Sequence, residues 1–105
     1  MRWLETIKVQ AAGGQDSTVE NELMALAHDL RKSPDCPGLL EAALYSHASL
    51  PGHFAIRLLW DTKCPQIQGS LLGLSLTQAL KAFGLVDHSV WIENRKKEGG
   101  RENER

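Results

Sequence analysis

The sequence predicts one α+β domain with the element order strand, helix, strand, strand, helix, strand. Four segments alternate apolar and polar residues, as strands do: 2–11, 39–47, 53–61 and 86–93. Two further segments space their apolar residues three and four apart, which is typical of amphipathic helices. At 105 residues, with 42% hydrophobic and 24% charged residues, the chain can bury one core without further support.

The third strand has the strongest pattern, and the prediction for the whole sheet starts from it. A tight turn is expected at Pro51-Gly52, because proline presets one turn dihedral and glycine accepts the positive one beside it. This turn joins segment 53–61 antiparallel to segment 39–47. One face of segment 53–61 is wholly apolar, with Phe54, Ile56, Leu58 and Trp60. Its other face is mixed, so a strand covered on both sides is predicted.

The first strand, 2–11, ends at Gly13-Gly14, and a helix follows it. Ser17 with Glu20 has the spacing of a capping box, and Ser33-Pro34 should end this helix. Its inward stripe is Val19, Leu23, Leu26 and Leu30.

The second strand opens at Pro37-Gly38, and the second helix should begin at an N-cap, Ser70, and end at Gly84. Leu40, Ala42 and Leu44 are expected on one face of that strand. The stripe of the second helix is Leu72, Leu76, Ala79, Leu80 and Phe83, widened by Leu71 and Leu74. Residues 95–105 contain no apolar side chain, so the domain is expected to span 1–94 with a disordered charged tail.

This order is the split βαβ, or ferredoxin-like, plan, in which both helices cover one face of a four-stranded antiparallel sheet. Every strand also carries apolar residues on its second face, among them Leu4, Leu59 and Trp91. Soluble monomers rarely expose so much apolar surface, so we expect a second copy of the chain to cover it.

At this point the residues resemble a known family, the dimeric α/β barrels of the antibiotic-biosynthesis-monooxygenase type. The resemblance covers about residues 1–94 and is carried by the element order, by the Cys36-Pro37-Gly38 turn, and by Trp60 at the end of the third strand. It implies two protomers around a cavity and oxygen chemistry on an aromatic or haem-like substrate, often without a cofactor. Haem-degrading members have an Asn in the first strand and a His where Ser70 stands, so haem degradation is not implied.

Four residues are candidates for a site: His88, Arg57, Trp60 and Tyr45. His88 alternates with valines on the last strand, so it is either a general base or a buried histidine bonded to a neighbour. Arg57 interrupts an apolar strand, so it is expected to hold an anionic ligand or to pair with a carboxylate. The carboxylates considered are Glu5, Glu41 and Glu93. The two aromatic residues can stack on a ligand or simply pack.

Other classes of function have weaker support. His47 and His53 flank the hairpin as an incomplete metal site, and Cys36 and Cys64 are predicted to be bystander thiols. A net charge of -1 offers no general attraction to nucleic acid or membranes. The start, Met1-Arg2-Trp3-Leu4-Glu5, lacks the apolar core of a signal peptide, so a cytoplasmic protein is expected.

The leading hypothesis is therefore a homodimer that binds a small apolar or aromatic ligand, with His88 as base, Arg57 orienting an anionic group and Trp60 shaping the pocket. No cofactor is predicted. The alternative is a binding or assembly protein without catalysis on the same scaffold, which the fold alone does not distinguish.

Overall fold

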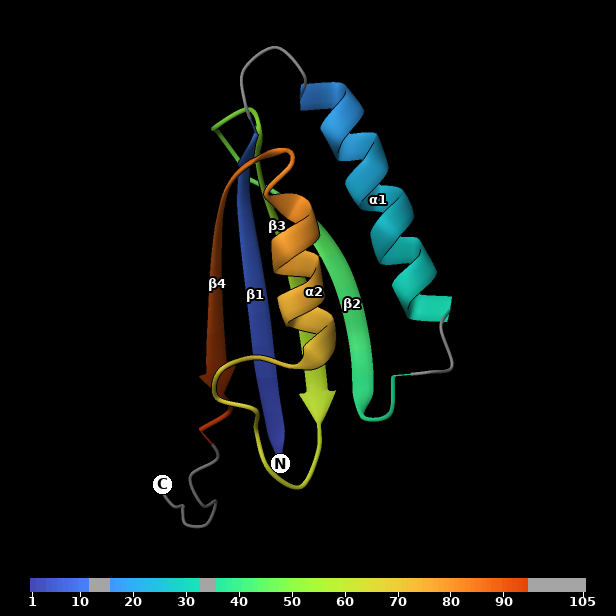
Figure 1. The fold of residues 1–105 in the computed structure, drawn as a ribbon, viewed down its shortest axis with the longest axis vertical. Helices are drawn as coiled ribbons and strands as arrows, with labels where there is room; N and C mark the ends of the chain where they lie inside the picture. Colours follow the sequence, from blue (N-terminus) through green and yellow to red (C-terminus); the bar gives the residue numbers. More distant parts are fainter. Residues whose placement is uncertain (12–15, 33–35, 95–105) are drawn as a thin grey trace, which may run out of the picture.

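The computed structural model describes residues 1–11, 16–32 and 36–94, with 16 and 17 described by their backbone alone. The elements are β1 (Arg2–Ala11), α1 (Asp16–Lys32), β2 (Leu39–Ser46), β3 (His53–Asp61), α2 (Leu71–Leu80) and β4 (Gly84–Ile92). The strands form one antiparallel sheet in the order β2-β3-β1-β4, and both helices lie on the same face of it (Figure 1). This is the predicted ferredoxin-like fold. The expected Gly13-Gly14 turn, the Ser33-Pro34 helix stop and the tail 95–105 lie outside the described residues.

The core lies between the sheet and the helices. It is built on the two central strands, whose alternate side chains point toward α1 and α2. The buried apolar residues are Trp3, Ile7, Val9, Val19, Leu23, Ala27, Ala42, Phe54, Ile56, Leu58, Trp60, Leu76 and Leu80. Helix α1 packs on β2, whereas α2 packs on β1 and β4. No helix among the described residues is long and apolar enough to cross a membrane.

The predicted hairpin turn between β2 and β3 is confirmed. Gly52 has a φ of 80°, and the N–H of His47 donates to the carbonyl of His53 at 2.8 Å. The N–H of Ala11 donates to the carbonyl of Gly52 at 2.8 Å, which ties the turn to the end of β1. The turn therefore helps to set the register of β3 with β2 and with β1.

The predicted end of the second helix is wrong. Helix α2 ends at Leu80 with Lys81 as its C-cap, and Gly84 is instead the first residue of β4. A Cβ at Gly84 would overlap the backbone carbonyl of Gln10, so glycine is needed where two strands approach closely. Leu71 and Leu74 do not widen the inward stripe as predicted, since they are 86% and 47% exposed. Helix α2 presents only a narrow stripe to the sheet. Ala79 is exposed as well.

Strand β2 also departs from strict alternation. Its register with β3 shifts between Leu39 and Glu41, so Leu40 is half exposed rather than sharing the buried face of Ala42. From Ala42 onward the predicted alternation holds.

Candidate functional site

A carboxylate is completely buried in the layer between the sheet and α2. Glu5 lies on β1 among side chains that point into the core, and it is 0% exposed. Burying an ionised carboxylate is very costly unless its oxygens receive hydrogen bonds. The surroundings of Glu5 must therefore supply donors.

Four donors meet this carboxylate. Oε1 accepts from Nε1 of Trp60 at 2.9 Å and from Oγ of Ser70 at 2.6 Å. Oε2 accepts from the backbone N–H of Ser70 at 2.9 Å and lies 2.8 Å from Nε2 of His88. We call these four residues, Glu5, Trp60, Ser70 and His88, the Glu5 cluster. It joins β1, β3 and β4 to the start of α2.

Ser70 is the predicted N-cap of α2, and it also serves the cluster. Its Oγ accepts from the N–H of Gly73 at 2.9 Å while donating to Glu5. The carboxylate therefore lies at the N-terminal end of the helix, where the helix dipole favours a negative charge.

Two glycines let the backbone approach the cluster. A Cβ at Gly73 would overlap the carboxylate of Glu5. A Cβ at Gly69, whose φ is 109°, would come within 2.7 Å of Cε1 of His88. Both positions exclude larger side chains while the Glu5 cluster is intact.

The hydrogen bonds determine which nitrogen of His88 can exchange a proton. With Glu5 ionised, Nε2 carries a proton whether the ring is neutral or charged, because Glu5 Oε2 can only accept. In the neutral ring Nδ1 then carries the lone pair, and it has no hydrogen-bond partner within the described part of the chain. The His88 side chain is 14% exposed and lies on the edge strand β4. A carboxylate-oriented histidine of this kind can act as a general base.

Trp60 is part of the core as well as of the cluster. Its ring stacks on Trp3, with centroids 5.5 Å apart and an interplanar angle of 14°. Trp3 in turn donates through Nε1 to Oγ1 of Thr62 at 2.8 Å. At 6% exposure, Trp60 holds Glu5 in place from within the core.

The sheet separates the four residues singled out in the sequence. His88 and Trp60 lie on the face covered by the helices, whereas Arg57 and Tyr45 lie on the opposite face, which we call the open face. Arg57 is exposed, with Cζ 5.3 Å from the centroid of the Tyr45 ring. The alternative in which Arg57 pairs with Glu5 is therefore wrong, because the two side chains lie on different faces of the sheet.

Sequence reasoning missed the role of Glu5, although a signal for it was present. Glu5 has the same parity as Trp3 and Ile7, so it is an acidic residue at a core position of β1. Ser70 was predicted only as a cap. The donors from β3 and β4 are distant in the sequence, so no local pattern could join them to Glu5.

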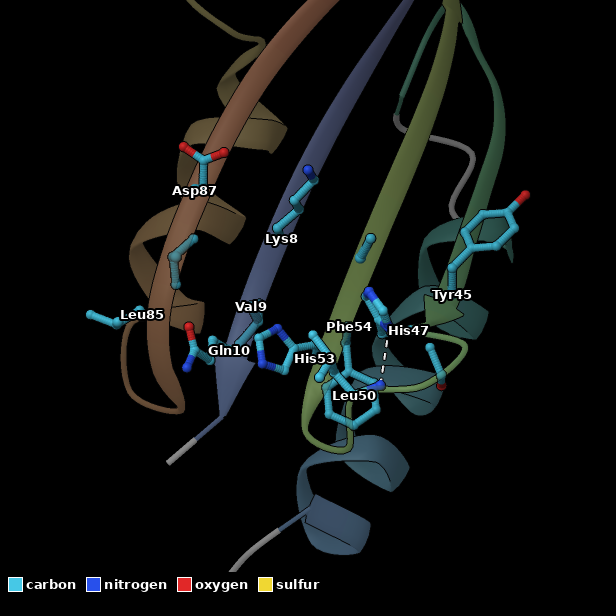
Figure 2. A pocket seen from close by; sticks show the side chains of 13 residues that line it. Lys8, Val9, Gln10, Tyr45, His47, Leu50, His53, Phe54, Leu85 and Asp87 are labelled. Atoms are coloured by element: carbon cyan, nitrogen blue, oxygen red, sulfur yellow. Dashed lines mark hydrogen bonds between the residues drawn. The ribbon is translucent and has the colours of Figure 1, made fainter. Parts of the chain in front are cut away.

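The open face has a hollow of about 450 Å³ at the end of the sheet nearest the β2–β3 hairpin (Figure 2). Tyr45, His47 and His53 line it, and the two histidine rings lie 5.9 Å apart. The described residues contain no group of three or more His, Cys, Asp or Glu side chains that could hold a metal ion. Cys36 and Cys64 are free thiols.

Comparisons with solved structures identify proteins of similar fold. A protein from Deinococcus radiodurans that has been assigned as an antibiotic biosynthesis monooxygenase has a TM-score of 0.62 at 16% identity. The match covers 90% of this chain and 95% of that chain. Rv0793 from Mycobacterium tuberculosis has a TM-score of 0.65 at 14% identity, covering 91% and 98%. SnoaB from Streptomyces nogalater, a cofactor-independent oxygenase solved as a mutant, has a TM-score of 0.61 at 12% identity, covering 93% and 97%.

No protein-family model and no curated protein matches the sequence. The structural likeness shows that this chain has the ferredoxin-like fold of the antibiotic-biosynthesis-monooxygenase type, as the sequence resemblance predicted.

Replacing Glu5 with Gln should lower the free energy of unfolding by about 2–4 kcal/mol, because the amide turns a donor toward groups that themselves donate. Denaturant unfolding followed by circular dichroism measures this loss. Glu41→Gln, at an exposed position of β2, is the matched control and should change stability by less than about 0.5 kcal/mol. Equal effects of the two variants would contradict the account of the Glu5 cluster.

In the neutral imidazole of His88 the proton should reside on Nε2, because that nitrogen donates to Glu5. Nitrogen-15 correlation spectra of the histidine side chains distinguish the two tautomers directly. His28, exposed on α1, provides the reference for a ring in water. A proton found on Nδ1 of His88 would show that Glu5 does not orient the ring as described.

Proposed function

We propose that this protein is a homodimeric, cofactor-independent oxygenase in which His88 removes a proton from a small aromatic substrate. The observation that carries the proposal is the contact between Nε2 of His88 and the fully buried carboxylate of Glu5. This contact leaves Nδ1 as the basic nitrogen of a ring whose orientation is fixed, which is what general base catalysis needs.

The fold supports the same class of reaction. SnoaB, which shares this fold, is a cofactor-independent oxygenase, so the scaffold can host oxygen chemistry that uses only protein groups. Fold alone does not assign an activity, so the proposal rests on His88 rather than on the likeness.

The reaction that fits a single base is the oxidation of a CH₂ group that is made acidic by conjugation with a carbonyl through an aromatic ring system. Nδ1 of His88 takes one proton, and the resulting carbanion reduces O₂ to a C–OO⁻ group. The protonated ring of His88 then returns its proton to give C–OOH. Loss of water then leaves C=O, so that CH₂ and O₂ become C=O and H₂O. Glu5 would act as a positioning residue, because it touches His88 and not the substrate.

Within the proposal, Trp60 shapes the site indirectly by holding Glu5. Arg57 and Tyr45 lie on the open face, so they cannot bind the same part of a substrate that contacts His88. Their role in ligand binding therefore requires a separate site on that face.

The proposed dimer forms through the open face. Leu4 and Leu59, both partly buried, and Trp91, which is 61% exposed, surround a hollow of about 210 Å³ at the end of the sheet opposite the hairpin. An exposed tryptophan beside two leucines is a typical anchor for a protein contact. We place the protein in the cytoplasm, where reducing conditions would keep Cys36 and Cys64 as free thiols.

The alternative is a protein that binds or assembles without catalysis. The close packing of Gly73 against Glu5 agrees with this alternative, because a cluster that serves only stability would be packed in the same way. Turnover experiments distinguish the two functions.

Light scattering coupled to size exclusion should give about twice the chain mass of 11.6 kDa for the wild-type protein. Trp91→Glu should shift the protein to the monomer, because a buried charge without a partner weakens a contact strongly. Leu71→Glu, on the exposed side of α2, is the control and should remain dimeric. A wild-type monomer at every concentration would contradict the dimer while leaving the role of His88 untouched.

His88→Gln should lower kcat/KM about 100-fold or more for any substrate that the wild-type protein oxidises, because it removes the base. Oxygen uptake can be measured with anthrones as substrates, because they carry the acidic CH₂ group that the reaction needs. His28→Gln is the control and should retain full activity, and circular dichroism checks that both variants fold. Unchanged turnover in His88→Gln would refute the base assignment, whereas a complete lack of turnover by the wild-type protein would favour the alternative without catalysis.

A further inference from the structure

We propose that the hollow on the open face binds a small hydroxylated aromatic acid. Its ring would lie against the apolar rim, and its carboxylate would face Lys8 and His47. This site is separate from His88 and lies at the opposite end of the sheet from Leu4, Leu59 and Trp91. The proposal therefore stands whether or not His88 is a base.

The hollow has the size and the walls of a site for a small molecule. Its volume of about 450 Å³ falls within the usual range for ligand pockets. Its rim comes from four strands, since the ends of β1 and β2 meet the starts of β3 and β4 there (Figure 2). A site built on strands holds its groups more firmly than one built on loops.

The rim offers flat and apolar surfaces that water covers in the single chain. Leu50 is 49% exposed, Leu85 72% and Tyr45 46%, and all three line the hollow. The rings of His47 and His53 meet edge to face beside them. These surfaces favour an aromatic ring, which gains both apolar burial and ring contacts.

His47 is held as a hydrogen-bond donor. Its Nδ1 accepts from the backbone N–H groups of Ser49 at 3.1 Å and Leu50 at 3.0 Å (Figure 2 shows the bond to Leu50). The proton of the neutral ring therefore resides on Nε2, which cannot offer a lone pair to a metal ion. The chemistry of the hollow consequently favours a ligand that accepts hydrogen bonds.

Lys8 supplies the positive charge. It lies opposite Asp87 in the pairing of β1 with β4, but no ion pair joins the two side chains in the part of the chain that the structure describes. The ammonium group is thus available to a carboxylate, and a charge-assisted bond of this kind is stronger than a neutral one. Asp87 would repel the acid group and accept from a hydroxyl, so it favours a hydroxylated acid with its carboxylate on the side of Lys8.

Titration of the full-length protein with 6-hydroxy-2-naphthoate, followed by nitrogen-15 amide spectra, tests the proposal. The amides of Gln10, Ala55 and Leu85 should shift in a saturable way. The neutral 6-hydroxy-2-naphthamide should bind about fivefold more weakly, as should the acid to Lys8→Gln. Lys8→Arg should retain the affinity for the acid.

Lys63→Gln, in the loop after β3, is the matched control because it removes the same charge at an exposed position away from the hollow. It should bind the acid like the wild-type protein. The amide spectrum of each variant shows whether it is folded. Equal affinity for acid and amide, equal weakening by Lys8→Gln and Lys63→Gln, shifts centred on Trp91, or no saturable shifts would each overturn the proposal.

Discussion

The buried carboxylate of Glu5 constrains more of this structure than any other group. It needs donors from several directions at once, and they come from β3, from β4 and from the residue before α2. These donors lie up to 83 positions from Glu5 in the sequence, so they meet only when the sheet has its native order. The hydrogen bonds therefore stabilise one packing of α2 on the sheet. Other packings would leave the charge of Glu5 buried without partners.

The sheet also divides the chemistry of the molecule into two layers. On the helix side, His88 and Trp60 belong to one closely packed cluster around Glu5. On the open side, Tyr45, Arg57 and Lys8 are accessible to solvent and to ligands. Because successive residues of a strand point to opposite faces, a shift of one residue would exchange these layers. The registers of β4 with β1 and of β2 with β3 thus keep the proposed base and the proposed ligand groups apart.

Much of the fold follows from local patterns in the sequence. The bounds of β1 and β3, the Pro51-Gly52 turn and the Ser70 cap are all predicted, because each depends on neighbouring residues. The errors arise where contacts between distant segments override the local pattern. Gly84 follows the second helix as a C-terminal glycine would, but it is needed because β1 approaches its backbone closely. The pairing of Arg57 with Glu5 failed because the parity of β3 alone does not show that Glu5 faces the helices while Arg57 faces the open side. The sequence indicated His88 as a candidate, but its partner Glu5 could be recognised only once β1 and β4 were paired.

The contact between Gly73 and Glu5 has a consequence for the history of this chain. Position 73 cannot gain even a methyl group while position 5 carries its acid, and the space becomes available only once that acid is lost or shortened. A substitution of Gly73 by a larger residue therefore has to follow a substitution of Glu5 by a shorter one. In any chain that packs in the same way, an acidic residue at the middle of the first strand therefore requires a glycine in the first turn of the second helix.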